Sequence, residues 1–384
     1  MRFHVINLPH TQTTKDYVAC AYTQKAIKFS NMMSSLGHEV ILYASEENEA
    51  NCDELVTIAS KDDQERWFGT PDYHTNFFNI TWSPNDSHWV ETNNNAIREI
   101  SKRIQPRDFI CLIAGVCQKQ IADSFPAHMS VEYGIGYRGV FSDYKVFESY
   151  SLMHWVYGSK NDDNGRFYDC VIPNYFDPDD FEFREEKDDY YVWMGRFIIR
   201  KGPGIATEVT RRLGSPLIMA GQGVVENTTR DGVTTLRGDE LTVSGEHIEH
   251  IGHVSPEERS KLLAGAKATF MATTYLEPFG GVAVESLMSG TPVIATDFGA
   301  FPENIPHGVA GYRFRTIGEA TQFASDEMLD KLDPNVIRKY AVDNFSMDVL
   351  KYRYQDYFDQ LETLWEDGFY SDKRTSDERY TRWI

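Results

Sequence analysis

The chain has 384 residues, of which 41% are hydrophobic, and a formal net charge of −20 at pH 7. This length exceeds the size at which a single hydrophobic core usually stops growing, so we expect two domains. The negative charge disfavours nonspecific binding to nucleic acid or anionic membranes, because both rely on many Lys and Arg contacts.

Two further features favour a soluble protein of the reducing cytoplasm. The five cysteines are scattered without Cys-x-x-Cys spacing, which predicts neither a disulfide framework nor a zinc site. No apolar run reaches the roughly 18 residues that span a bilayer, and residues 1–8 lack the charged start and long apolar core of a signal peptide.

Strand-like apolar runs alternate with helical patterns from the N-terminus, which predicts a doubly wound α/β architecture. In the first half we expect strands at residues 2–8, 39–44 and 108–114 and a helix at 22–36. The loop at residues 9–15 then falls at the carboxyl edge of the sheet, where ligands bind in such folds. Two interpretations fit His10, Thr11 and Thr13 equally: contacts to a polar ligand, or a Thr-capped loop that leads into the helix.

Residues 60–95 interrupt the pattern with aromatic residues in a polar setting, namely Trp67, Phe77, Phe78, Trp82 and Trp89. A disordered segment would be poor in such residues, so we expect an ordered insertion with its own aromatic packing, in preference to an aromatic platform for a ligand. The basic residues that follow, Arg98, Lys102, Arg103 and Arg107, are interpreted as a solvated helix face.

A second ligand-side loop is expected at residues 131–138, after a short strand. Its glycines favour close approach of the backbone to a ligand, with Tyr133 and Gly134 at that approach. Glu132 has two interpretations of equal weight: it orients or deprotonates a hydroxyl group, or it forms a structural ion pair with Arg138.

The acidic segment 177–189 is interpreted as the connection to a second α/β unit. In that unit we expect strands at 190–195, 216–220 and 268–274 and a helix at 281–288 that is closed by Gly290. The aromatic residues at helical spacing after residue 348 predict a C-terminal helix.

The most informative segment is 277–285, Glu-Pro-Phe-Gly-Gly-Val-Ala-Val-Glu. Gly280 and Gly281 fall at the N-terminus of the predicted helix, where unpaired N–H groups and the helix dipole attract an anion. The lack of side chains there lets a phosphate approach closely. With a diphosphate at the glycines, Glu277 and Glu285 would each stand near one sugar ring, which fits a nucleotide sugar.

This segment resembles the retaining glycosyltransferases of the two-domain GT-B type, in particular family 4 (glycosyl transferases group 1), whose mark is two Glu separated by seven residues. Similar elements follow in the family's order at residues 195–202 (Gly-Arg-Phe-Ile-Ile-Arg-Lys-Gly), 219–223 (Met-Ala-Gly-Gln-Gly), 252–254 (Gly-His-Val) and 292–303. The likeness covers about residues 171–312, and its joint specificity is high.

The resemblance implies two Rossmann-like domains that face a central cleft. Residues 1–172 would form the acceptor domain and 173–347 the donor domain, with the C-terminal helix in 348–384 packing back on the first. Glu277 would contact the transferred sugar and Glu285 the donor ribose. Arg196 and Lys201 would neutralise the donor's diphosphate.

Further site residues follow from the same resemblance. The implied donor-binding residues are Gly195, Gly221, Gly223, His253, Val254, Phe279, Gly280, Gly281 and Val282, with His253 beside the base. His10, Thr11, Thr13, Tyr133 and Gly134 fall on the acceptor side. Many family members have a His where this chain has Glu132, a departure that makes Glu132 a catalytic candidate.

The implied reaction moves a sugar from a nucleoside-diphosphate sugar, with a UDP-glucose-like donor as first guess, to an acceptor hydroxyl with retention. The nucleotide sugar is a co-substrate, and neither a metal nor another cofactor is expected. The sequence does not identify the acceptor, which can be a glycan, a lipid-linked glycan or another molecule. A modified base of phage-type DNA is an alternative that the negative net charge of the chain disfavours. The sequence also leaves open a GT-B-fold nucleotide-sugar epimerase and a non-catalytic sugar-nucleotide-binding protein. Nothing in the sequence indicates the oligomeric state.

Overall fold

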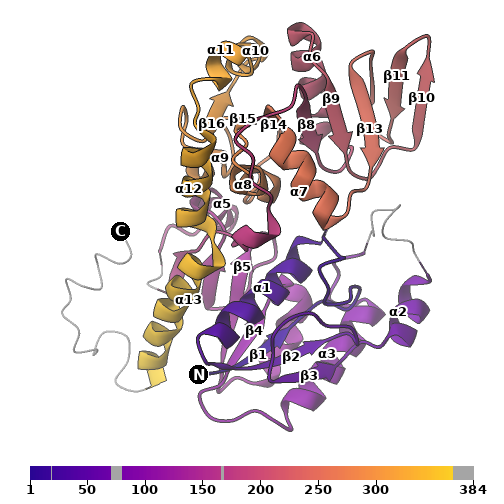
Figure 1. Cartoon of the computed structure of the whole chain (residues 1–384). Coiled ribbons are helices and arrows are strands. Elements are labelled where there is room, and N and C mark those ends of the chain that lie inside the picture. Colours follow the sequence, from indigo (N-terminus) through magenta and orange to yellow (C-terminus); the bar gives the residue numbers. More distant parts are fainter. Residues whose placement is uncertain (19, 71–79, 166–167, 366–384) are drawn as a thin grey trace, which may run out of the picture.

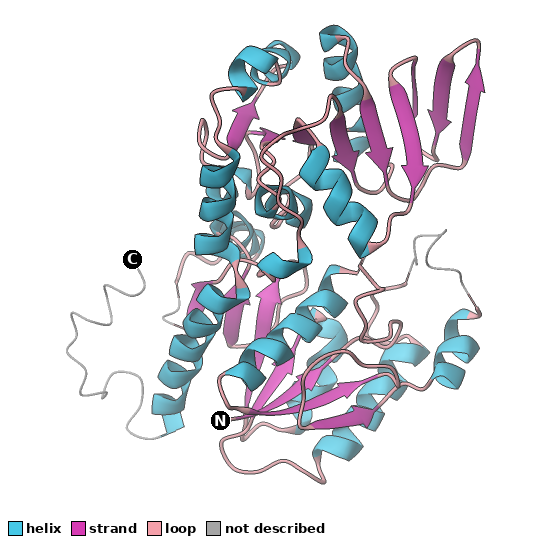
Figure 2. Ribbon diagram, viewed as in Figure 1, coloured by secondary structure: helices cyan, strands magenta, loops and turns pink. Residues whose placement is uncertain are grey.

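Two parallel sheets, each flanked by its own helices, make up the protein (Figures 1 and 2). The computed structural model describes residues 1–18, 20–70, 80–165 and 168–365. We call the part built on the sheet β1–β7 the first unit and the part built on β8–β16 the second unit. Figure 1 shows the two units one above the other, with helix α13 running alongside the first.

The first unit contains seven parallel strands in the order β3-β2-β1-β4-β5-β6-β7. The strands are β1 (Arg2–Ile6), β2 (Glu39–Ala44), β3 (Glu54–Thr57), β4 (Phe109–Leu112), β5 (Met129–Ile135), β6 (Tyr144–Phe147) and β7 (Asp169–Val171). The helices are α1 (Ala21–Ser35), α2 (Lys61–Phe68), α3 (Ser87–Ile100), α4 (Lys119–Ser124) and α5 (Tyr150–Ser159). The strand order reverses between β1 and β4, which is where doubly wound sheets bind ligands.

The second unit has six parallel strands in the order β13-β9-β8-β14-β15-β16. The strands are β8 (Tyr191–Met194), β9 (Leu217–Ala220), β13 (Ile248–Gly252), β14 (Ala268–Met271), β15 (Val293–Thr296) and β16 (Gly311–Phe314). The helices are α6 (Pro203–Leu213), α7 (Pro256–Gly265), α8 (Gly281–Met288), α9 (Phe301–Asn304), α10 (Ile317–Phe323), α11 (Asp326–Leu329) and α12 (Pro334–Phe345).

A separate antiparallel sheet of β10 (Glu226–Arg230), β11 (Val233–Arg237) and β12 (Thr242–Gly245) interrupts the second unit between β9 and β13. The sequence pattern does not predict this sheet. Its strands are rich in Thr and half of their residues are exposed, and within them only Leu236 and Val243 are buried apolar residues. The alternating apolar pattern that marks a half-buried strand is therefore weak.

Elsewhere the predicted elements agree closely with the structure. The predicted helix 281–288 and strand 39–44 have the bounds of α8 and β2, and the predicted helix 22–36 is shifted by one residue from α1. Residues 60–95 are ordered where the structure describes them, and they include α2 and most of α3. Trp89 is fully buried in the first core, whereas Trp82 is 46% exposed; Phe77 and Phe78 lie outside the described residues.

The C-terminal helix α13 (Met347–Glu362) crosses back to the first unit, as the GT-B resemblance implies. The ring of Phe358 lies 4.7 Å from that of Phe3 and 4.9 Å from that of Phe109, centroid to centroid. The helix thus completes the first core with aromatic side chains. The domain limits 1–172 and 173–347 stay predictions; the two sheets divide between β7 and β8.

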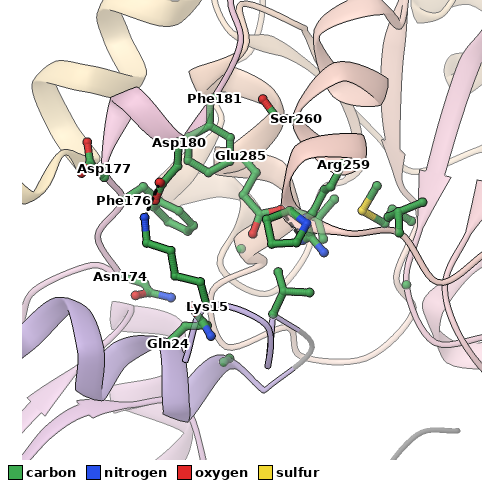
Figure 3. Close-up of a pocket in the computed structure, with 18 of the residues that line it drawn as sticks. Lys15, Gln24, Asn174, Phe176, Asp177, Asp180, Phe181, Arg259, Ser260 and Glu285 are labelled. Atoms are coloured by element: carbon green, nitrogen blue, oxygen red, sulfur yellow. Dashed lines mark hydrogen bonds and ion pairs between the residues drawn. The ribbon is translucent and has the colours of Figure 1, made fainter. Parts of the chain in front are cut away.

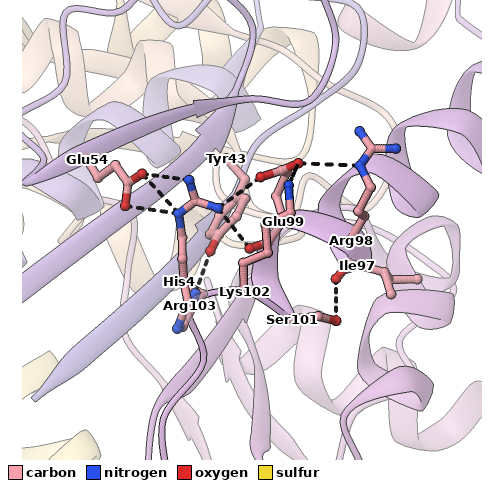
Figure 4. A network of polar contacts seen from close by, with 9 residues as sticks. All are labelled: His4, Tyr43, Glu54, Ile97, Arg98, Glu99, Ser101, Lys102 and Arg103. Atoms are coloured by element: carbon pink, nitrogen blue, oxygen red, sulfur yellow. Dashed lines mark hydrogen bonds and ion pairs between the residues drawn. The ribbon is translucent and has the colours of Figure 1, made fainter.

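The basic residues at the end of α3 form an ion-pair network on the surface of the first unit (Figure 4). The guanidinium of Arg103 donates to Glu54 at 2.7 Å and to Glu99 at 2.9 Å. Lys102 and Arg103 together lower the pKa of Glu99 to about 2. These cations are paired with carboxylates, which supports the interpretation as a solvated helix face.

In the described part of the chain, no helix is both long and apolar enough to cross a bilayer.

Candidate functional site

A cavity of about 760 Å³ lies between the two units. Its walls come from α1 and the loop after β1 in the first unit, and from the connecting segment 174–182, α7 and α8 in the second. Figure 3 shows Lys15 and Gln24 of the first unit on one side of the cavity and the pair Arg259 and Glu285 on the other. Lys15 Nζ lies 2.7 Å from a carboxylate oxygen of Asp180, so an ion pair joins the two sides.

The N-terminus of α8 opens into this cavity, and Gly280, Gly281 and Val282 line it. Gly280 is in the left-handed conformation (φ 82°), and a Cβ there would lie 2.5 Å from a ring carbon of Phe301. No side chain caps the helix. The first N–H groups of a helix have no partner within it, so this end of α8 is suited to hold an anion.

Beside α8, Glu277 and Lys201 meet. Glu277 lies between β14 and α8 and is only 7% exposed, and Lys201 Nζ donates to its Oε2 at 2.8 Å. Arg196 also lines the cavity, and burial together with the neighbouring Arg200 lowers its pKa. Two cations and the helix terminus thus converge on the space next to Glu277.

Glu285, one turn into α8, has a partner that the sequence pattern does not reveal. Arg259 Nε donates to Glu285 Oε2 at 2.5 Å, and both residues line the cavity. Arg259 lies in the second turn of α7, which starts directly after the Gly-His-Val element at a capping box of Ser255 and Glu258. That proximity to a recognised element is the one signal in the sequence that points to Arg259.

The other predicted donor-site residues divide into two groups. Gly195, Gly221, His253 and Val254 line the cavity. At Gly221 (φ 130°) a Cβ would lie 2.0 Å from the carbonyl oxygen of Gly195, so the two backbone segments touch. Gly223 and Phe279 do not line it: Gly223 packs against Phe197, and Phe279 is buried against Phe176 and Phe345. The assignment of the Phe279 side chain to the donor is corrected to core packing.

None of the predicted acceptor-side residues, His10, Thr11, Thr13, Tyr133 and Gly134, lines this cavity. The Thr11 hydroxyl shares a hydrogen bond of 2.6 Å with Thr23, and Thr13 accepts one from Asn7, which favours the interpretation as a loop that leads into α1. The predicted Thr cap is wrong, because the N-cap of α1 is Cys20 and no side chain caps the helix. The His10 ring contacts Phe68 and Trp82 edge-on, and burial lowers its pKa to about 3. Tyr133 is stacked on Phe29 in the core, and the Gly134 carbonyl accepts a hydrogen bond from Lys25.

Glu132 requires a correction, because the geometry does not fit a catalytic role. Glu132, Tyr133 and Gly134 lie inside β5 and not in a loop, and Glu132 is fully buried. Its Oε2 accepts hydrogen bonds from the backbone N–H groups of Phe141 and Ser142, and its Oε1 accepts one from the Tyr137 hydroxyl. The carboxylate is structural, but its partners are these groups and not Arg138, whose guanidinium lies over the Trp155 ring.

We expect Glu132→Ala to destabilise the protein without impairing catalysis. The change leaves buried N–H donors without acceptors, which costs about 1 to 3 kcal/mol in the free energy of unfolding. Urea denaturation measures this loss, and kcat/KM is compared at a temperature where both proteins are folded. A large loss of kcat/KM in a variant of normal stability would restore the catalytic interpretation.

Comparison with known proteins agrees with this geometry. Residues 177–326 match the sequence model of the family "Glycosyl transferases group 1". The chain is 30% identical over 125 residues to a glycogen synthase of Mycobacterium tuberculosis, which is 31% of this chain and 28% of that protein. It is 29% identical over 123 residues to the D-inositol 3-phosphate glycosyltransferase of Mycolicibacterium smegmatis, which is 31% of this chain and 27% of that protein. The matched stretch therefore spans less than a third of these curated relatives.

Solved structures resemble the chain over nearly its full length. AviGT4, a glycosyltransferase involved in avilamycin A biosynthesis, superposes with a TM-score of 0.61 at 20% identity over 94% of this chain and 98% of its own. Anabaena Alr3699/HepE in complex with UDP-glucose gives 0.59 at 13% identity over 95% of this chain and 100% of its own. Residues 177–326 thus resemble the glycosyl transferases group 1 family, within a chain that has the two-domain GT-B fold.

Proposed function

We propose that this protein transfers a sugar from a nucleoside-diphosphate sugar to an acceptor hydroxyl with retention at the anomeric carbon. The observation that carries the proposal is the convergence of Arg196, Lys201, the α8 N-terminus, Glu277 and Glu285 on one cavity between the two units. The first three suit a diphosphate. The two carboxylates suit the hydroxyl groups of a sugar on either side of it.

The chemistry gives a role to the two cations that line the cavity near Glu277. Cleavage of the sugar–phosphate bond leaves negative charge on the departing diphosphate and oxocarbenium character on the sugar. Arg196 and Lys201, aimed at the diphosphate before the reaction starts, stabilise the first charge, and such preorganised groups are often the largest single term in catalysis. The buried carboxylate of Glu277 faces the second charge. By the family resemblance, the departing phosphate takes the acceptor's proton, and no metal or other cofactor takes part.

A UDP-glucose-like donor is the first candidate, supported by the solved complexes of Anabaena Alr3699/HepE with UDP and with UDP-glucose. Its test is a thermal-shift screen against nucleoside diphosphates and nucleotide sugars, followed by mass spectrometry of reactions with candidate acceptors. We expect one nucleoside diphosphate to raise Tm and the matching nucleotide sugar to be consumed only when an acceptor is present. Conversion of the nucleotide sugar without an acceptor to an epimer would identify an epimerase instead.

Glu285→Ala tests the assignment of the ribose. We expect the loss of its hydrogen bonds to the ribose hydroxyls to weaken binding of the nucleoside diphosphate by about 1.5 to 3 kcal/mol, the range for a hydrogen bond to a charged group. Calorimetry with the ribonucleotide and its 2′-deoxy analogue separates this effect from the release of Arg259. The analogue should bind the wild type more weakly, but the variant should bind both alike. Unchanged affinity of the variant for the ribonucleotide contradicts the assignment.

A further inference from the structure

Lys28 of α1 brings a cation of the first unit into the cavity. It lines the wall opposite α7 and α8, and its Nζ lies 4.2 Å from the centroid of the Phe176 ring. Within the described residues, its ammonium group has neither a hydrogen bond nor an ion pair. By contrast, Arg259, Lys201 and Lys15 at the same cavity each contact a carboxylate.

The position of Lys28 relates directly to the N-terminus of α8. A Cβ on Gly281 would lie 3.8 Å from the tip of the Phe176 ring and 3.9 Å from Oε1 of Glu285. Phe176 therefore lies close to the first residue of α8, and the ammonium of Lys28 lies over that ring. The cation is thus next to the place where the helix terminus and Glu285 suit a phosphate and a ribose.

The surroundings of Lys28 favour an added anion. Burial lowers its pKa to about 8, which the charges of Glu285 and Asp180 only partly offset, while Arg259 and Lys15 oppose its charged form. A partly buried ammonium that has neither a hydrogen bond nor an ion pair gains more from an anion than an exposed one does, because the interaction is screened less. A structural role limited to the contact with Phe176 would leave this charge compensated only in part, by Glu285 and Asp180.

We propose that Lys28 contacts the diphosphate of the donor, so that the nucleotide is held by cations from both units. The proposal rests on the proposed function. It adds a residue of the first unit to a site whose other phosphate ligands, Arg196, Lys201 and α8, all belong to the second. Binding of the donor then favours the arrangement in which the two units face each other across the cavity.

Lys28→Met and Lys28→Arg test this contact by calorimetry at pH 7 with UDP and GDP. For the diphosphate that the wild type binds, we expect Met to weaken affinity by about tenfold or more and Arg to keep it within about threefold. Affinity for the corresponding nucleoside should change little in either variant. The matched control is Lys119→Met, which removes an exposed cation that pairs with Asp123 away from the cavity.

The dependence of affinity on pH gives a second readout. The charged groups that face Lys28 are Glu285 of α8, Arg259 of α7, Asp180 of the connecting segment and Lys15 of the loop after β1, whose pKa is raised by its hydrogen bond to Asp180. Among them, Lys28 is the group expected to lose its proton near pH 8. The wild type should therefore bind the diphosphate more weakly at pH 9 than at pH 7. Lys28→Arg should show a flatter profile.

The outcomes distinguish a failure of the Lys28 contact from a failure of the proposed function. If the wild type binds a nucleoside diphosphate and Lys28→Met binds it equally well, the contact is wrong and the proposed function stands. The contact is also wrong if Lys28→Met lowers Tm but weakens the nucleoside and its diphosphate alike, since Lys28 is then structural. If the wild type binds neither of these diphosphates and no other nucleoside diphosphate in the thermal-shift screen, the proposed function fails, and the inference fails with it.

Discussion

Removal of the side chain of Arg196 or of Lys201 is expected to lower kcat/KM by about a hundredfold or more, by analogy with the loss of one preorganised donor at a developing charge. Both side chains line the cavity beside the α8 N-terminus, so both act on the same departing diphosphate. The measurement is the initial rate of each Ala variant at subsaturating donor. Arg211→Ala is the matched control, because Arg211 of α6 is exposed, pairs with Glu208 and does not line the cavity.

The double variant sharpens this test. With either cation gone, the other still stabilises part of the charge, so the two losses should not add. Lys201 also holds Glu277 through the 2.8 Å ion pair, so its removal should disturb the carboxylate as well and cost more than that of Arg196. Activity should survive EDTA. Loss of turnover in EDTA that Mg²⁺ or Mn²⁺ restores, together with near-normal activity of Arg196→Ala, contradicts the role given to these cations.

The segment around the α8 N-terminus shows what the sequence reveals best. A short apolar helix that begins at Gly281 and is closed by Gly290 has few alternatives for its start and end, and α8 has the predicted bounds. The motif residues next to it, Glu277 and Glu285, both reach the cavity because backbone geometry near a helix terminus depends on local sequence. Local rules therefore recover the part of the site that is built from consecutive residues.

The rest of the site depends on contacts between distant segments. Lys28 and Arg259 are cations on helices, and nothing in an amphipathic pattern says which polar residue faces a cavity and which faces water. Glu132 is the opposite case, because the sequence predicted it as a site residue and the structure shows it to be structural. A Glu followed by Tyr and Gly predicts a loop, but backbone N–H groups at Phe141 and Ser142 stabilise the carboxylate inside a buried strand. These donors lie nine and ten residues later in the chain, so the residues next to Glu132 do not predict them.

Glu277→Gln is expected to lower kcat on the order of a hundredfold while affinity for the nucleoside diphosphate is kept. The amide of Gln still accepts a hydrogen bond from a sugar hydroxyl, but it no longer offers a negative charge to the sugar as oxocarbenium character develops. An interaction that is made mainly in the transition state affects kcat, and not the binding of a product that lacks the sugar. The substitution also removes the ion pair between Glu277 and Lys201, which frees Lys201 for the diphosphate. The difference between the loss of kcat and the retained affinity for the diphosphate should therefore be larger.

The measurement pairs the initial rate at saturating donor with calorimetric titration of the free nucleoside diphosphate. Glu226→Gln on the exposed strand β10 is the matched control, since it removes one carboxylate outside the cavity. For Glu277→Gln we expect the diphosphate to bind as tightly as to the wild type, or more tightly. For Glu285→Ala we expect weaker binding, since its carboxylate acts on the ribose that donor and product share. A residue that acts on the transferred sugar alone has no contact with the free diphosphate. Equal losses of kcat and of affinity in Glu277→Gln would therefore contradict the separate roles given to Glu277 and Glu285.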